Sequence, residues 1–78
     1  MYTIITRDNC EYCDKVKALL ELDSLPYTVY NLSDVPNKWV LRLLREANIK
    51  TVPQVFDYSG SWIGGFTELH ELLTEGPL

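Results

Sequence analysis

The sequence has few cysteine and histidine residues. It contains one histidine, His70, and two cysteines, Cys10 and Cys13. A structural zinc site usually needs four Cys or His ligands, so we expect no metal site within one chain. A disulfide between cysteines this close would remove little entropy from the unfolded chain. The pair is therefore not expected to act as a structural staple.

Long hydrophobic runs are also absent. The longest apolar stretches, such as Val40 to Leu44, are broken by charges and are too short to span a bilayer. The N-terminal segment has no basic stretch followed by an apolar run and a cleavage site. We therefore expect a cytoplasmic protein without a membrane segment.

Basic residues are scarce as well. Seven Lys and Arg stand against eleven Asp and Glu, which gives a net charge of -4. The basic residues are spread from Arg7 to Lys50 and form no cluster in the sequence. This distribution argues against nucleic acid as a partner, because phosphate binding needs clustered cations.

The 78 residues contain no linker, repeat or low-complexity segment, so we expect a single domain over residues 1–78. Short β-branched or aromatic runs alternate with longer amphipathic runs, which is typical of an α/β fold. The order βαβαββα predicts one mixed four-stranded sheet flanked by three helices. The expected elements span residues 2–6, 10–22, 27–32, 36–48, 52–56, 62–63 and 67–75.

Each predicted helix has an apolar stripe at helical spacing that should face the sheet. The residues expected on these stripes are Cys13, Val16, Leu19 and Leu20 in the first helix, Val40, Leu43, Leu44 and Ala47 in the second, and Leu69, Leu72 and Leu73 in the third.

The segment Cys10-Glu11-Tyr12-Cys13 carries the clearest chemical signal. Its spacing lets the two sulfurs form a disulfide across one helical turn, and Cys10 falls at the helix N-terminus. Only a thiolate attacks a disulfide, and the positive end of a helix favours an anion. We therefore predict that Cys10 is the nucleophile and that Cys13, on the apolar stripe, is the resolving thiol.

Two further segments are candidates for ligand binding. Thr51-Val52-Pro53 places a proline at the head of a strand, where it is either an ordinary trans edge residue or a cis residue that exposes the preceding backbone. Gly64-Gly65-Phe66-Thr67-Glu68 is either a simple strand-to-helix turn or a place where free N–H groups bind a carboxylate.

Taken with Thr6-Arg7 and Ile63, these segments resemble the glutaredoxin family in order and spacing. The resemblance implies a thioredoxin-like fold, a cis Val52–Pro53 bond, and disulfide reduction with glutathione as co-substrate. It also implies that no cofactor is tightly bound.

The resemblance further implies a groove for glutathione. Arg7 would bind the glycyl carboxylate, the Val52 backbone would pair with the cysteinyl part, and the N–H groups of Phe66 and Thr67 would bind the γ-glutamyl carboxylate. The residues expected at this groove are Arg7, Tyr12, Thr51, Val52, Pro53, Gly65, Phe66 and Thr67.

Two positions depart from the family pattern. Glu11 stands where proline is common, and its charge should oppose thiolate formation at Cys10 and make the couple more reducing. Thr67 stands where an acidic residue often meets the glutamyl amine, a role that Glu68 is expected to take.

Two other functions remain open. One is a glutaredoxin-like redoxin that takes electrons from thioredoxin reductase and passes them to ribonucleotide reductase. The other is an iron–sulfur cluster bridged by two chains through Cys10 and two glutathiones. For the main hypothesis we expect a monomer whose partners are glutathione and disulfide-bearing proteins, with ribonucleotide reductase as a target by family analogy.

Overall fold

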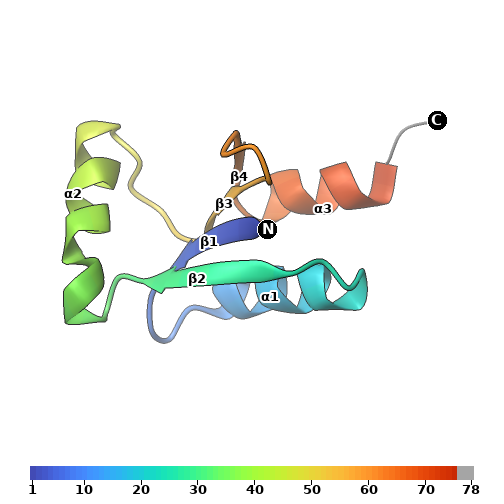
Figure 1. Ribbon diagram of the computed structural model, residues 1–78, viewed down its shortest axis with the longest axis horizontal. Helices are drawn as coiled ribbons and strands as arrows, with labels where there is room; N and C mark the ends of the chain where they lie inside the picture. The colour runs from blue at the N-terminus through green and yellow to red at the C-terminus, as the bar shows by residue number, and fades with distance from the viewer. Residues whose placement is uncertain (76–78) are drawn as a thin grey trace.

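The computed structural model describes residues 1–75 and has the predicted order of elements (Figure 1). No helix in this part of the chain is long and apolar enough to cross a membrane. The elements are β1 (Tyr2–Thr6), α1 (Glu11–Leu22), β2 (Tyr27–Asn31), a 3₁₀ turn (Val35–Asn37), α2 (Lys38–Glu46), β3 (Gln54–Phe56), β4 (Trp62–Gly64) and α3 (Phe66–Glu75).

The four strands form one mixed sheet, as predicted, and their order in the sheet is β2-β1-β3-β4. Strand β1 runs parallel to β2 and antiparallel to β3, with Ile5 opposite Gln54. Strand β3 runs antiparallel to β4, with Val55 opposite Gly64. The end of β1, the start of β3 and the end of β4 therefore lie at the same end of the sheet.

The two faces of the sheet bury different clusters, because successive side chains of a strand point to opposite faces. Ile4 and Val55 pack with Val16 and Leu20 of α1 and Leu69 of α3. On the other face, Ile5 packs with Leu32 and with Val40 and Leu44 of α2. Helices α1 and α3 thus cover one face and α2 covers the other (Figure 1).

The predicted stripe of α1 is confirmed, but three residues on the other helices are not buried. Leu43 and Ala47 are exposed, because α2 packs through Val40, Leu44 and the half-buried Leu41. Leu72 is also exposed. Helix α3 instead packs through Phe66, Leu69 and Leu73.

Several predicted boundaries were wrong by one or two residues. Strand β3 starts at Gln54 rather than Val52, because Pro53 has no N–H to donate to the ladder. The predicted helix 36–48 begins as the 3₁₀ turn, and α2 ends at Glu46, before Asn48 takes a φ of 58°. Strand β2 ends at Asn31, β4 includes Gly64, and α3 begins at Phe66. The expected stop at Gly76-Pro77 lies outside the described residues.

Candidate active site

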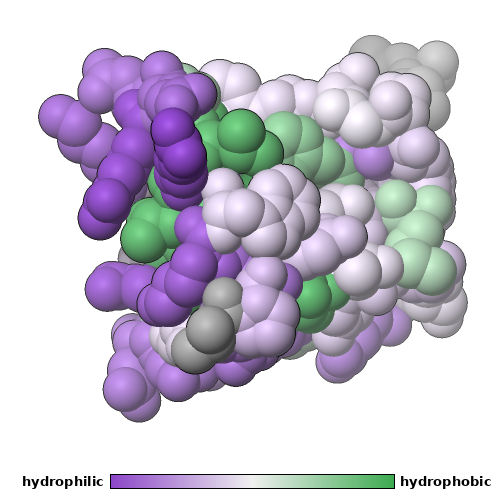
Figure 2. All heavy atoms as spheres, turned by 60° about the vertical axis from the view of Figure 1, so that its left-hand side comes forward, coloured by the Kyte–Doolittle hydropathy of each residue, from purple (hydrophilic) through white to green (hydrophobic). Residues whose placement is uncertain are grey.

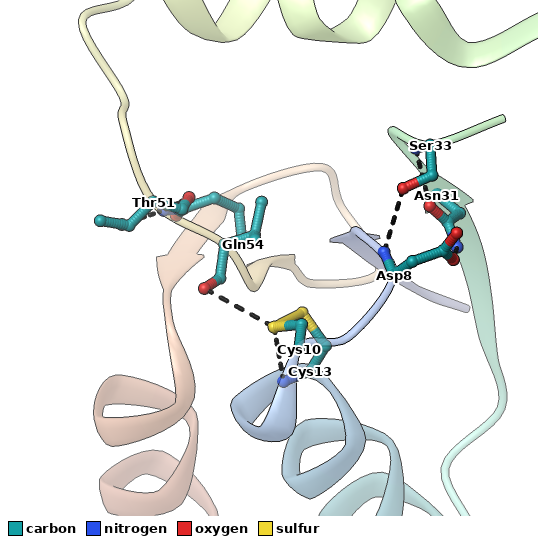
Figure 3. The surroundings of a disulfide bond; sticks show 8 residues. Asp8, Cys10, Cys13, Asn31, Ser33, Thr51 and Gln54 are labelled. Atoms are coloured by element: carbon teal, nitrogen blue, oxygen red, sulfur yellow. Dashed lines mark hydrogen bonds between the residues drawn. A yellow bond between two sulfur atoms is a disulfide. The ribbon is translucent and has the colours of Figure 1, made fainter. Parts of the chain in front are cut away.

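Cys10 and Cys13 form a disulfide across the first turn of α1, with their Cα atoms 5.2 Å apart (Figure 3). Cys10 is the N-cap of the helix, and its extended backbone lets Sγ accept a hydrogen bond from the Cys13 N–H at 3.2 Å. Cys13 is only 1% exposed, whereas Cys10 is half-buried. The predicted difference in accessibility between the two cysteines is confirmed.

The loop before β3 lies against the disulfide. The Val52–Pro53 peptide bond is cis, as the resemblance implied. The carbonyl oxygen of Val52 lies 4.0 Å from Cys10 Sγ. This sulfur carries no proton in the disulfide, but after reduction a protonated Cys10 thiol can donate to the Val52 carbonyl.

A cleft of about 240 Å³ extends from this loop to the start of α3. Seven of the eight residues expected at a glutathione groove line it, and Glu68 completes the lining. The lining residues are Tyr12, Thr51, Val52, Pro53, Gly65, Phe66, Thr67 and Glu68. The three sequence signals therefore meet at one site, as the common end of β1, β3 and β4 requires.

Arg7, the eighth expected residue, does not line this cleft. It lines a larger cavity of about 520 Å³ together with Arg45 and Lys50. Thr51 and Val52 line both spaces, so Arg7 lies across the Thr51–Val52 segment from the cleft.

The larger cavity combines an apolar wall with positive charge. Five of its lining residues are apolar, namely Leu32, Leu41, Leu44, Ile49 and Val52, and no acidic residue lines it. Figure 2 shows apolar surface framed by hydrophilic side chains on the side of the molecule where α2 lies. The sequence analysis missed Arg45 and Lys50, although Lys50 directly precedes the Thr51-Val52-Pro53 signal.

Glu68 caps the start of α3. Its Oε1 accepts a hydrogen bond from the Gly65 N–H at 2.7 Å. Gly64, which has a φ of 125°, leaves room for this contact, because a Cβ there would lie 2.7 Å from Glu68 Oε1. Since N–H groups in the first turn of a helix have no intrahelical acceptors, Phe66 and Thr67 can offer theirs to a ligand.

Aromatic side chains connect α1 to α3 beside the cleft. The ring centroids of Tyr12 and Phe66 lie 5.7 Å apart, and those of Phe66 and His70 also lie 5.7 Å apart. Lys15 Nζ lies 4.7 Å from the centre of the Tyr12 ring and 3.6 Å from Glu11 Oε1. Lys15 thus partly balances the charge that Glu11 places beside Cys10.

The loop between β1 and Cys10 is held by polar contacts with the end of β2 (Figure 3). The Asp8 N–H donates to Ser33 Oγ at 3.1 Å, and Asn31 Nδ2 donates to Asp8 Oδ1 at 2.9 Å. These contacts fix the approach to Cys10, where Asn9 has a φ of 55°. Within residues 1–75 no cluster of three or more His, Cys, Asp or Glu side chains is arranged to hold a metal ion.

Comparison with known proteins gives a consistent result. The family model for glutaredoxin matches residues 2–61. A glutaredoxin of Enterobacteria phage T4 is 38% identical over 73 residues, which cover 80% of this chain and 82% of the relative. The human mitochondrial glutaredoxin-2 is 32% identical over 77 residues, or 96% of this chain. The match spans only 46% of the human protein, about half its length.

Among solved structures, the crystal structure of a buckwheat glutaredoxin–glutathione complex superposes with a TM-score of 0.81 at 27% sequence identity. The match covers 96% of this chain and 69% of the buckwheat chain.

Proposed function

Because this chain belongs to the glutaredoxin family, we propose that it is a glutathione-dependent thiol-disulfide oxidoreductase acting on protein disulfides and on glutathione mixed disulfides. The members of this family exchange thiols with disulfides through active-site cysteines, and the Cys10–Cys13 pair of this chain can form the corresponding disulfide. A dithiol mechanism is therefore available to it.

The observation that carries this proposal is the position of the cleft relative to the sulfur. Val52 lines the cleft, and its carbonyl oxygen lies 4.0 Å from Cys10 Sγ. Tyr12, between the two cysteines, lines the same cleft. A tripeptide bound there would have its own sulfur next to the more accessible cysteine, which is what exchange requires.

The proposed cycle starts from the reduced protein. The Cys10 thiolate attacks one sulfur of a substrate disulfide, that S–S bond breaks, and the released substrate thiolate takes up a proton. Cys13, as a thiolate, then attacks Cys10 Sγ, which releases the second substrate sulfur as a thiolate that takes up a proton, and forms the Cys10–Cys13 disulfide. Two glutathiones reduce this disulfide in two exchanges and leave as glutathione disulfide.

In this proposal the two ends of glutathione would lie in the two spaces on either side of Thr51 and Val52. In the cleft, the N–H groups of Phe66 and Thr67 would bind the γ-glutamyl carboxylate, and Glu68, which also lines the cleft, would meet the glutamyl amine. The glycyl carboxylate would meet the basic rim of the larger cavity, where Arg7 is joined by Arg45 and Lys50. A buckwheat glutaredoxin with the same fold forms a complex with glutathione, which supports glutathione as the ligand of this chain.

The protein substrates are proposed on family analogy alone. Disulfide-bearing proteins form the general class, and ribonucleotide reductase is one candidate within it. The identity of the reductant decides between the main proposal and a redoxin that depends on thioredoxin reductase.

The deciding experiment supplies the protein with a glutathionylated peptide and measures NADPH oxidation under two couplings. One coupling contains glutathione and glutathione reductase, and the other contains thioredoxin reductase. We expect turnover with the first. Turnover with thioredoxin reductase alone would contradict the proposal, and visible-range absorption of the purified protein would instead favour cluster binding.

A further inference from the structure

The buried side chain of Gln54 connects the edge of the sheet to the proposed glutathione site. Gln54 is the first residue of β3 and is only 4% exposed. Its Nε2 donates to the Thr51 carbonyl oxygen at 2.8 Å and to Thr51 Oγ1 at 3.2 Å. Its Oε1 accepts a hydrogen bond from Trp62 Nε1 of β4 at 2.8 Å. The side chains therefore form a chain of hydrogen bonds from Trp62 through Gln54 to Thr51.

The chemistry of the end groups fixes the direction of this chain. An indole N–H can only donate, so it requires the oxygen of the Gln54 amide. A backbone carbonyl can only accept, so Thr51 requires the amide nitrogen. Of the uncharged side chains of this length, only glutamine provides both an acceptor and a donor at its end.

The segment that Gln54 holds has few other restraints. In the connection after α2, backbone–backbone hydrogen bonds continue as far as Ile49, whose N–H donates to the Leu44 carbonyl at 2.8 Å. In the described part of the chain, Lys50 to Pro53 make no further backbone–backbone hydrogen bond outside the strands. Thr51 itself is exposed, yet it lies beside Gln54 on the segment that faces the disulfide (Figure 3).

This segment is also the wall shared by the cleft and the basic cavity, because Thr51 and Val52 line both. A small rotation of the Thr51–Val52 peptide would turn the Val52 N–H away from a ligand, because this N–H lies in the same peptide plane as the Thr51 carbonyl. The hydrogen bonds from Gln54 to Thr51 oppose such a rotation.

We infer that Gln54 is a positioning residue for glutathione: with Trp62 as its outer support, it holds the Thr51–Val52 backbone in the orientation that binds the tripeptide. The inference rests on the proposed function and deepens it, since it names what orders the binding segment. Gln54 does not touch the reacting sulfurs, so its loss should weaken binding more than it slows exchange.

The variant Gln54→Met tests this, because methionine is uncharged and similar in length but makes none of the three hydrogen bonds. We expect KM for a glutathionylated peptide to rise roughly fivefold, the equivalent of about 1 kcal/mol for one net hydrogen bond. The value of kcat should change less than twofold. Gln54→Glu keeps the acceptor for Trp62 but loses both donors to Thr51, so KM should rise by at least as much.

Two variants at tryptophan positions complete the series. Trp62→Phe removes only the outer link, and we expect KM to rise about twofold, as suits one indirect hydrogen bond. Trp62 is 58% exposed, so this variant should fold. Trp39→Phe is the matched control, because Trp39 is similarly exposed on α2, lines neither space, and should leave KM unchanged.

A spectroscopic measurement separates positioning from general stability. The two indole N–H signals can be followed by NMR while the oxidised protein is titrated with S-methylglutathione, and Trp39→Phe assigns them. We expect the Trp62 signal to shift on binding and the Trp39 signal to stay in place. In Gln54→Met the Trp62 signal should no longer respond.

The outcomes distinguish the inference from the proposed function. Wild-type protein that turns over no glutathionylated peptide would overturn the proposed function, and the inference with it. Active wild type together with a folded Gln54→Met whose KM is within twofold would overturn the inference alone. Should Gln54→Met fail to fold, an unshifted Trp62 signal in wild type and an unchanged KM in Trp62→Phe would overturn it as well.

Discussion

The backbone N–H of Cys13 donates a hydrogen bond to Cys10 Sγ at 3.2 Å. The relationship is not reciprocal, because Cys10 precedes the helix while Cys13 lies inside it and is almost fully buried. An N–H group aimed at a sulfur stabilises its negatively charged form. This single bond therefore favours Cys10 as the thiolate after reduction and leaves Cys13 to act from the interior.

Serine substitutions should separate the roles of the two cysteines. Cys10→Ser is expected to abolish turnover of both protein disulfides and glutathione mixed disulfides, because no accessible nucleophile remains. Cys13→Ser is expected to retain exchange with glutathionylated peptides, where a second glutathione resolves the intermediate, and to lose dithiol reduction of a protein disulfide. Insulin reduction and a glutathionylated-peptide assay, run in parallel, measure the two activities. Equal losses in both assays for Cys13→Ser would contradict the assignment.

Glu11→Pro should increase the reactivity of Cys10. Glu11 is the first residue of α1, where proline fits because the N–H there has no intrahelical acceptor. Loss of its negative charge should raise the thiolate-to-thiol ratio of Cys10 roughly two- to fivefold. This corresponds to the ~0.3–1 kcal/mol that is typical of the electrostatic interaction of one charge with the end of a helix. The pH dependence of alkylation by iodoacetamide measures this ratio.

The control for this experiment is Asp23→Asn, which removes the same charge at the other end of α1. A helix of this length places it about 18 Å away, beyond the screening length of about 8 Å at physiological salt. Alkylation should therefore be unchanged. A thiolate fraction in Glu11→Pro that is the same as in wild type, or lower, would refute the electrostatic argument.

The sequence was sufficient to predict the elements that have clear periodicity. Strand β1 ends at Thr6 and helix α1 ends at Leu22, as their patterns indicate. The buried face of α2 was not predictable in the same way. Val40, Leu41, Leu43 and Leu44 are all apolar, so the sequence offers two overlapping stripes. Only the packing of α2 against Ile5 and Leu32 selects the one with Leu41.

The candidate site was predictable where its residues fall in recognisable segments. Cys10, Val52 and Gly65 belong to three such segments, and the strand order explains why these segments meet. Gln54 was missed as a site residue because its role depends on Trp62, eight positions away, and no local pattern joins them. Arg45 was missed for the same reason, since its position at the cavity depends on how α2 ends.

The exposed and buried leucines of α3 offer a direct test of the corrected helix face. Leu69 is fully buried in the cluster beneath α1, and Leu72 is 50% exposed. Leu69→Ala should lower the free energy of unfolding by about 2–5 kcal/mol, because it leaves a cavity in the core. Leu72→Ala should change it by less than about 0.5 kcal/mol. Urea unfolding measures both changes. Equal losses of unfolding free energy would show that Leu72 is buried, as the sequence predicted.

The contact between Tyr27 and Glu21 should make stability depend on pH in the alkaline range. The Tyr27 hydroxyl donates to Glu21 Oε1 at 2.5 Å, and this hydrogen bond, followed by burial and the carboxylate charge, raises the pKa of Tyr27 to about 12. In the unfolded chain the pKa of tyrosine is about 10, so between these values only the folded state keeps the proton. Stability from this contact is therefore complete below about pH 10 and is lost as the pH rises through about 12.

The difference in urea midpoint between wild type and Tyr27→Phe should be constant from about pH 7 to 9 and should shrink above about pH 10. Glu21→Gln should remove most of the same dependence, because the amide carries no charge to oppose ionisation of the phenol. A difference that persists unchanged to pH 12 would show that the hydroxyl contributes nothing through its protonated form.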